Sequence, residues 1–284
     1  MASILTAINN LSHKNNNRIE LVTSSRTVAN AMGDSLQAYV EKLFINNVEN
    51  LTPEQINDQK EIIFSWSGNQ NNIPDLILKN GDAIEIKKIE GVGSLALNSS
   101  HPKQVLSSES PMITSKCKIC EGVGKNWEKE LWYIIGTVNE NKIKYLFFIQ
   151  GKLYAAEDSV YARIKNIIKT GVTEIENVQF AETKELGRVN KVDPLGITSL
   201  RIRGMWDIEH PFNVYSYIPE LEKSGDEDKL ISYVIVEKTK YLTFDSYERQ
   251  QIEVNDRISI FDKKIKNPDN PVQLIDIKLI KVEV

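Results

Sequence analysis

Residues 74–87 read PDLILKNGDAIEIK and carry a strong hairpin signal. Two runs of strand-forming residues flank Asn80-Gly81, a dipeptide that favours tight turns. A two-residue turn would scatter the apolar side chains over both faces of the hairpin, because side chains alternate along a strand. A three-residue loop, with Gly81 as a left-handed bulge, instead pairs Leu78 with Asp82. Burial of one face favours this second register, and we therefore predict it.

This register separates the apolar side chains of the hairpin from the charged ones. One face carries the apolar residues Leu76, Leu78, Ile84 and Ile86. The other face carries Asp75, Glu85 and Lys87. Two carboxylates can hold Mg²⁺ while leaving it several waters, and the cation can neutralise charge on a scissile phosphate. A nearby lysine can orient or deprotonate the attacking water.

The hairpin therefore has the residues that a magnesium-dependent nuclease needs. The alternative is a half-buried hairpin with a salt-bridged surface. A similar pattern occurs near the C-terminus, where residues 268–269 read PD and residues 276–278 read DIK. There the turn cluster at 267–271 leaves no first strand to run from Asp269 to Asp276, so we assign the site to the first hairpin.

Composition indicates an ordinary globular protein. The chain has 284 residues, 41% of them hydrophobic, enough for one large domain or two small ones. No apolar run approaches the roughly 20 residues that span a bilayer, and a cytoplasmic location is the default expectation. The net charge of −4 does not indicate a nucleic-acid binder, but it does not exclude a local basic cleft.

The acidic residues concentrate at 220–228, which we interpret as an exposed linker. We therefore expect one domain over residues 1–218, which carries the catalytic hairpin and the second polar constellation described below, and a β-rich C-terminal region over residues 219–284, with the linker near 219–229.

Cys117 and Cys120 are the two cysteines of the chain, so there is no disulfide framework. Their C-x-x-C spacing is half of a four-cysteine zinc site, to which His101 could add a ligand. We favour two free thiols.

Hydrophobic periodicity predicts three helices, at residues 3–11, 33–46 and 159–169. Asp34 or Ser35 could cap the second helix. The third helix should stop at Gly171 and bury the apolar residues Val160, Ile164, Ile167 and Ile168.

Glu41 lies one residue off the apolar stripe of the second helix. Its carboxylate could reach a second metal ion, but we favour a solvated helix charge.

Strands are predicted on both sides of the third helix. Those before it lie at residues 62–66, 75–89, 131–138 and 144–149. The last two are apolar throughout, as is typical of central strands covered on both faces. Those after the linker lie at residues 230–236, 241–244, 258–261 and 274–284. Helices around a mixed sheet give an α/β layered core.

A second polar constellation lies between residues 187 and 206. Arg201 and Arg203 project to the same face of a predicted strand, and Asn190 and Lys191 lie in the adjoining turn. Two arginines side by side suit phosphates or the O6 and N7 atoms of guanine. The alternative is an edge strand with solvated arginines.

Several segments, taken in order, resemble the type II restriction endonucleases of the NgoPII and NgoBV kind, in the PD-(D/E)xK nuclease superfamily. The segments are residues 30–34, 74–75 with 81–88, 96–103, 185–188 and 204–206. The resemblance spans roughly residues 1–218. The sequence departs from the family at Gln37, where an acidic residue is expected.

The resemblance implies a restriction-endonuclease-like core with a mixed central sheet. It implies a homodimer that cuts double-stranded DNA at a palindromic G+C-rich site of the GGCC or GGNNCC type, accompanied by a cognate DNA methyltransferase. Asp75 and Glu85 would ligate Mg²⁺, the Ile86 carbonyl would be a further ligand, and Lys87 would position the water.

The candidates for base and backbone contacts come from local chemistry. They are Arg188, Asn190, Lys191, Arg201 and Arg203. Two other functions remain open from the residues: a non-specific or structure-specific repair nuclease on the same core, and a DNA-binding regulator without catalysis.

Overall fold

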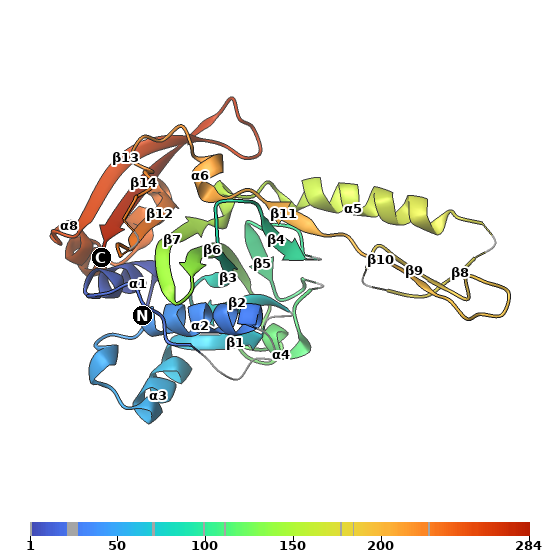
Figure 1. Ribbon diagram of the computed structural model, residues 1–284, viewed down its shortest axis with the longest axis horizontal. Coiled ribbons are helices and arrows are strands. Elements are labelled where there is room, and N and C mark those ends of the chain that lie inside the picture. Colours follow the sequence, from blue (N-terminus) through green and yellow to red (C-terminus); the bar gives the residue numbers. More distant parts are fainter. Residues whose placement is uncertain are drawn as a thin grey trace.

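A nine-stranded mixed sheet is the centre of the computed structural model (Figure 1). The structure describes residues 2–21, 28–69, 72–98, 100–110, 112–176, 178–183, 185–226 and 228–284. Eight strands follow one another across the sheet in the order β1 (Phe64–Asn69), β2 (Asn72–Leu78), β3 (Ala83–Ile89), β6 (Glu128–Asn139), β7 (Lys142–Gln150), β12 (Ile231–Glu237), β14 (Leu274–Glu283) and β13 (Ile258–Lys266). The ninth, β5 (Val105–Ser107), pairs with β6.

The sheet is mixed because β3 and β6 pair in parallel, as do β7 and β12, whereas the other neighbours are antiparallel. Strands β6 and β7 lie at its centre and are buried over most of their length. The expected fold class, a mixed central sheet flanked by helices, is therefore confirmed. Strands β6 and β7 contain continuous apolar stretches because other elements cover the sheet on both faces.

The C-terminal strands continue this sheet, because β12 pairs with β7 from Ile231↔Tyr145 to Ile235↔Ile149. The acidic segment that precedes them contacts the sheet. Glu220 forms an ion pair with Lys263 of β13. The hydroxyl of Tyr233 accepts a hydrogen bond from the N–H of Glu222 and donates one to its carbonyl. The division of the chain at residue 218 stays a prediction. The parts before and after this residue contribute strands to the same sheet.

The region after residue 229 contains two helices that were not predicted. Residues 241–244, predicted as a strand, lie largely in helix α7 (Lys238–Thr243), and α8 (Ser246–Glu253) follows. Asp245 begins α8 by accepting hydrogen bonds from the N–H groups of Tyr247 and Glu248. The strand predicted at residues 241–244 was therefore wrong, whereas the β-rich character of the region follows from β12, β13 and β14.

Three N-terminal helices precede the sheet in the chain. The first, α1 (Ile4–Ser12), begins at a capping box formed by Ser3 and Thr6, as the sequence predicted to within a residue. The second, α2 (Val28–Leu43), begins earlier than predicted, so Asp34 and Ser35 are interior and do not cap it. The third, α3 (Pro53–Ile63), was missed, although Thr52 and Gln55 form its capping box.

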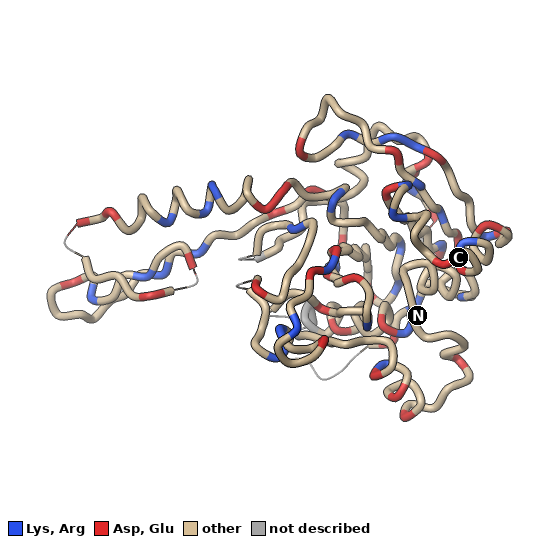
Figure 2. Tube along the Cα trace, turned by 180° about the vertical axis from the view of Figure 1, so that it is seen from behind, with Lys and Arg blue, Asp and Glu red and all other residues tan. Residues whose placement is uncertain are grey.

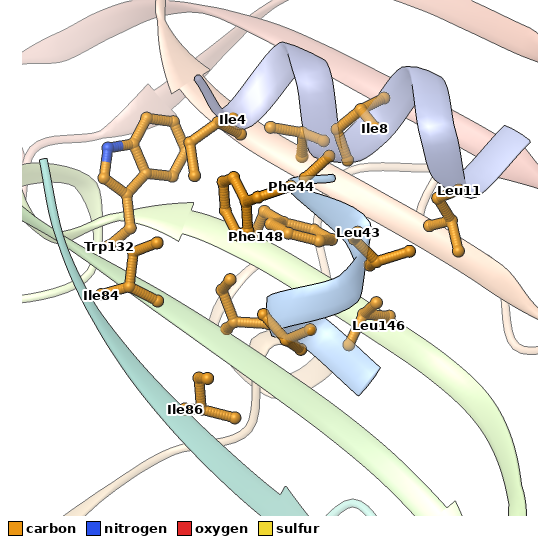
Figure 3. Packing of buried hydrophobic residues seen from close by; sticks show 14 of the residues in the cluster. Ile4, Ile8, Leu11, Leu43, Phe44, Ile84, Ile86, Trp132, Leu146 and Phe148 are labelled. Atoms are coloured by element: carbon orange, nitrogen blue, oxygen red, sulfur yellow. The ribbon is translucent and has the colours of Figure 1, made fainter. Parts of the chain in front are cut away.

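Buried side chains form one cluster on each face of the sheet. The first cluster joins α1 and α2 to strand residues that include Leu76, Leu78, Ile84 and Ile86. Figure 3 shows Ile84 and Ile86 together with helix residues of this cluster. The second lies under β4 (Leu95–Asn98), α4 (Ser115–Lys118), β11 (Trp206–Ile208) and α6 (Pro211–Val214). The predicted apolar face of the hairpin is thus buried as a unit.

The hairpin has the predicted register but a different turn. Leu76 pairs with Ile84, and the N–H of Leu78 donates to the carbonyl of Asp82 at 3.0 Å. The left-handed residue is Asn80, with φ 55°, and not Gly81. A Cβ atom on Gly81 would lie 2.9 Å from that of Leu78. Gly81 is therefore required for space, and its predicted left-handed conformation was wrong.

An arm extends from the core, formed by α5 (Asp158–Thr173) with β8 (Gln179–Phe180), β9 (Gly187–Asn190) and β10 (Leu200–Ile202) (Figure 1). The helix was expected to bury four apolar residues and to stop at Gly171. Instead it runs through Gly171, and Val160, Ile164, Ile167 and Ile168 are 39–63% exposed. The pattern is amphipathic as predicted, but most of the helix projects beyond the core that would have covered it.

Within the described part of the chain, no helix is both long and apolar enough to cross a bilayer.

Gly151 offers a test of packing at the end of β7. A Cβ atom there would lie 2.7 Å from the carbonyl oxygens of both Leu131 and Lys103. We expect Gly151→Ala to lower the free energy of unfolding by about 1–3 kcal/mol, as overpacking does. The matched control is Gly33→Ala inside α2, where no atom of the described residues, other than its chain neighbours and the helix's own backbone, lies within 4 Å of the added methyl group. Urea denaturation should show the control unchanged or slightly stabilised; equal stability of both variants would contradict the packing argument.

Candidate active site

Asp75 lies where the hairpin strands begin to separate. Beyond the pairs Ile77↔Ala83 and Leu76↔Ile84, its Oδ2 atom accepts the N–H of Ile86 at 2.6 Å. The carboxylate thus replaces a carbonyl as the partner of this strand N–H. Asp75 is only 8% exposed, so it is held at the sheet by burial and by a backbone hydrogen bond.

Glu85 and Lys87 complete the predicted trio. They are two residues apart on β3 and share one face, and Lys87 Nζ donates to Glu85 Oε1 at 2.6 Å. Glu85 is 5% exposed, and the Lys87 side chain is mostly covered. The structure therefore brings together the three side chains that the sequence singled out, two of them buried carboxylates.

Burial raises the pKa of Asp75 well above its usual value, and the nearby carboxylates of Glu85 and Glu41 raise it further. Burial alone would lower the pKa of Lys87, but the charges of Glu85 and Asp75 outweigh it and raise that pKa. Lys87 is therefore a cation at neutral pH. In this state it can donate to a water or a phosphate but cannot accept a proton.

The two carboxylates fit a divalent cation. Among the described residues, Glu85 Oε2 is buried without a hydrogen-bond partner, and Asp75 carries the repulsion of its neighbours. A hard cation would give Glu85 Oε2 a partner and would reduce the repulsion between Asp75 and its neighbouring carboxylates. No three His, Cys, Asp or Glu side chains of the described residues converge on a ready metal cage. Water, backbone and phosphate oxygens would supply the remaining ligands, as is usual for Mg²⁺.

Glu41 was expected to be a solvated charge, and this was wrong. It is 7% exposed and accepts hydrogen bonds from Gln37, Ser67 and Lys60. Its charge raises the pKa of Asp75, which places it in the electrostatic environment of the site. Its position beside the apolar stripe was the available signal, and the pairing with Lys60 of α3 was not visible in the sequence.

A further cluster borders the site and was not anticipated. Tyr133 stands opposite Glu85 in the β3–β6 ladder, and its hydroxyl bonds both the N–H and the carbonyl of Lys103. Lys103 Nζ and His101 Nε2 both contact Asp158 in the first turn of α5. The segment 96–103, which carried part of the resemblance, therefore links the catalytic face to the root of the arm.

The possible zinc site at the cysteines gains no third ligand from His101, which stacks on Tyr161 and contacts Asp158. Cys117 and Cys120 are free thiols, and Cys117 is buried. The second acidic pattern also behaves as surface: Asp276 is exposed and pairs with Lys264.

The five candidate DNA contacts lie on the arm, away from β2 and β3 (Figures 1 and 2). Arg188 stands directly opposite Arg201 in the β9–β10 ladder. Arg201 and Arg203 lie on the same side, because both donate to Glu185. Asn190 ends β9, and Lys191 follows it with φ 52°.

Asp75→Asn should stabilise the protein, because it removes a buried charge while keeping an oxygen that can accept the Ile86 N–H. Since the folded pKa of Asp75 is raised, the ionised form is penalised as pH rises above the usual Asp value of about 3.9. The gain should be absent in acid and reach about 0.5–2 kcal/mol at neutral pH, the range typical of stabilising substitutions. Urea denaturation in a chelator, from about pH 4 to pH 8, measures it.

The control for this variant is Asp276→Asn, an exposed position where stability should not change. Ca²⁺ should raise the melting temperature of the wild type more than that of Asp75→Asn, because binding to the folded state stabilises it. A gain at Asp75 that does not depend on pH would contradict the electrostatic explanation.

The chain is similar to known restriction endonucleases. The family model described as NgoPII restriction endonuclease matches residues 2–266, well beyond the expected span of 1–218. The type II restriction enzyme NgoPII of Neisseria gonorrhoeae is 44% identical over 283 residues, covering 98% of each chain. No solved structure matches the chain. The chain therefore belongs to the NgoPII restriction endonuclease family.

Proposed function

We propose that this restriction endonuclease cuts both strands of duplex DNA in a Mg²⁺-dependent reaction, at a short palindromic G+C-rich site of the GGCC or GGNNCC type. The observation that carries the proposal is the pair of buried carboxylates, Asp75 and Glu85, beside the cationic Lys87 on one hairpin. A regulator without catalysis would have no use for two buried, mutually repelling carboxylates.

Each of these residues has a distinct role in the proposal. Asp75 and Glu85 hold Mg²⁺, and the Ile86 carbonyl is a further ligand. Bound there, the ion neutralises charge on the scissile phosphate. Lys87 donates hydrogen bonds that orient the attacking water toward the phosphorus. Because Lys87 is protonated in the free protein, the proton released by the water passes to another acceptor, such as a phosphate oxygen.

The arm supplies DNA recognition in this proposal. The major groove admits a narrow β ribbon, and Arg188 and Arg201 are exposed on one face of the β9–β10 pair. Arg203 adds a third guanidinium, and Asn190 and Lys191 continue the polar surface toward the loop. Arginine donates bidentate hydrogen bonds to guanine or to phosphate, which suits a G+C-rich site.

A homodimer matches a palindromic site, because one two-fold axis then relates both half-sites and both active sites. The described residues of one chain carry one such active site, which can cut one strand. The exposed apolar residues of α5 offer a surface that a second copy would cover. A cytoplasmic location, where the DNA lies, and a cognate DNA methyltransferase that protects the host site complete the proposal.

Lys87→Ala tests the catalytic assignment. Plasmid cleavage with Mg²⁺ should fall by about 10²–10³-fold, the usual cost of removing one positioned hydrogen-bond donor from an active site. Binding to a duplex in Ca²⁺ should persist, because the arm is intact. Asp276→Ala is the matched control and should cleave like the wild type. Undiminished cleavage by the Lys87 variant would refute the assignment.

The wild-type digest also separates the candidate functions. Discrete fragments are expected, and the sequences at their ends would identify the site. A smear would favour a repair nuclease, and intact plasmid with a gel shift would favour a regulator.

Ile167→Asp tests the surface for a second copy. This side chain is 63% exposed on α5, and an aspartate at a dimer interface would bury an unpaired charge. Light scattering after gel filtration should show a dimer for the wild type and a monomer for the variant. Val272→Asp, 92% exposed between β13 and β14, is the control and should stay dimeric. A dimeric Ile167 variant would place the interface elsewhere.

A further inference from the structure

Glu185 holds two of the arm arginines at once. Arg201 donates to it through Nε at 3.1 Å and Nη2 at 2.7 Å, in a fork that engages both carboxylate oxygens. Arg203 Nε donates to the same carboxylate at 2.8 Å. Arg188 stands directly opposite Arg201 in the β9–β10 ladder, so a third arginine is on the strand next to this pair.

The carboxylate lies behind the arginines. The side chain of Glu185 is 17% exposed, whereas those of Arg201 and Arg203 are 52% and 61% exposed. The hydrogen bonds from Arg201 lower the pKa of Glu185, so it is ionised at physiological pH. A guanidinium has five N–H donors in a planar fork, so both arginines keep donors for an outer partner.

This arrangement affects phosphates and bases differently. Affinity for phosphates grows with net positive charge, and one carboxylate cancels part of that charge. Reading a base edge depends on a fixed guanidinium plane, and a hydrogen bond from behind fixes it. Glu185 should therefore weaken binding to the DNA backbone while keeping the arginines oriented for bases.

We propose that Glu185 is a specificity-determining residue, which orients Arg201 and Arg203 toward base edges and suppresses their binding to phosphates of non-target DNA. The inference rests on the proposed DNA-binding role of the arm. It concerns the ratio of target to non-target binding and assigns Glu185 no part in the chemical step.

Glu185→Gln tests the inference, since glutamine keeps the size and removes the charge. The probe is a labelled mixed-sequence duplex of about 30 base pairs, in buffer without a metal ion that supports cleavage. Protein is titrated into the probe, and binding is measured by fluorescence anisotropy at salt concentrations between about 50 and 200 mM. The variant should bind this duplex more tightly, with a log–log salt slope steeper by about 0.9 for each additional phosphate contact. In Mg²⁺ it should also cut plasmid at additional sites.

Two variants act as controls. Glu182→Gln removes the same charge from an exposed position in the same segment and should reproduce the wild-type slope. Glu185→Asp retains the charge and should retain most of the discrimination. A merely structural role for Glu185 predicts the opposite result for Glu185→Gln, because a distorted arm would bind DNA less tightly.

The outcomes distinguish this inference from the proposed function on which it rests. If Arg201→Ala and Arg203→Ala leave binding unchanged both to the mixed-sequence duplex and to a duplex that carries the mapped cleavage site, the arm does not bind DNA and the proposed function of the arm fails. If those variants weaken binding but Glu185→Gln binds like the wild type or more weakly, the arm function stands and the inference about Glu185 is overturned.

Discussion

Burial of one apolar face of the β2–β3 hairpin is the constraint on which the site depends. Leu76 and Ile84 can enter the core together only in one register, because a slip of one residue would move every side chain to the other face. That register places Asp75 and Glu85 together on the opposite face, where they repel each other. The hydrophobic core thus stabilises a carboxylate pair that electrostatics alone would separate.

The same sheet connects this pair to the rest of the molecule. Tyr133 stands next to Glu85, and its hydroxyl forms hydrogen bonds with the backbone of Lys103. The ammonium group of Lys103 contacts Asp158 at the start of α5. The arm therefore begins at the edge of the candidate active site. The proposed recognition and cleavage sites thus lie on separate surfaces, which are joined by hydrogen bonds across one short segment.

Much of this could be predicted from local patterns. The hairpin register followed from alternation, and α1 followed from its apolar periodicity, although its capping box was not predicted. The turn did not follow, because asparagine tolerates the left-handed region nearly as well as glycine does, and only contact with Leu78 decides which position needs the smaller residue. Residues 241–244 look like a strand locally, but they lie mostly in a helix that packs on β14.

By itself the sequence determined the family and the fold class, and it predicted a shared face for Asp75, Glu85 and Lys87, because short motifs and alternation along a strand can be read from the chain alone. Only the tertiary structure decided the surroundings. It buried Glu41 by bringing Lys60 from another helix, and it joined the C-terminal strands to the catalytic sheet. It also left the apolar stripe of α5 exposed. Amphipathic spacing shows which face of a helix is apolar, but segments distant in the chain decide whether that face is buried.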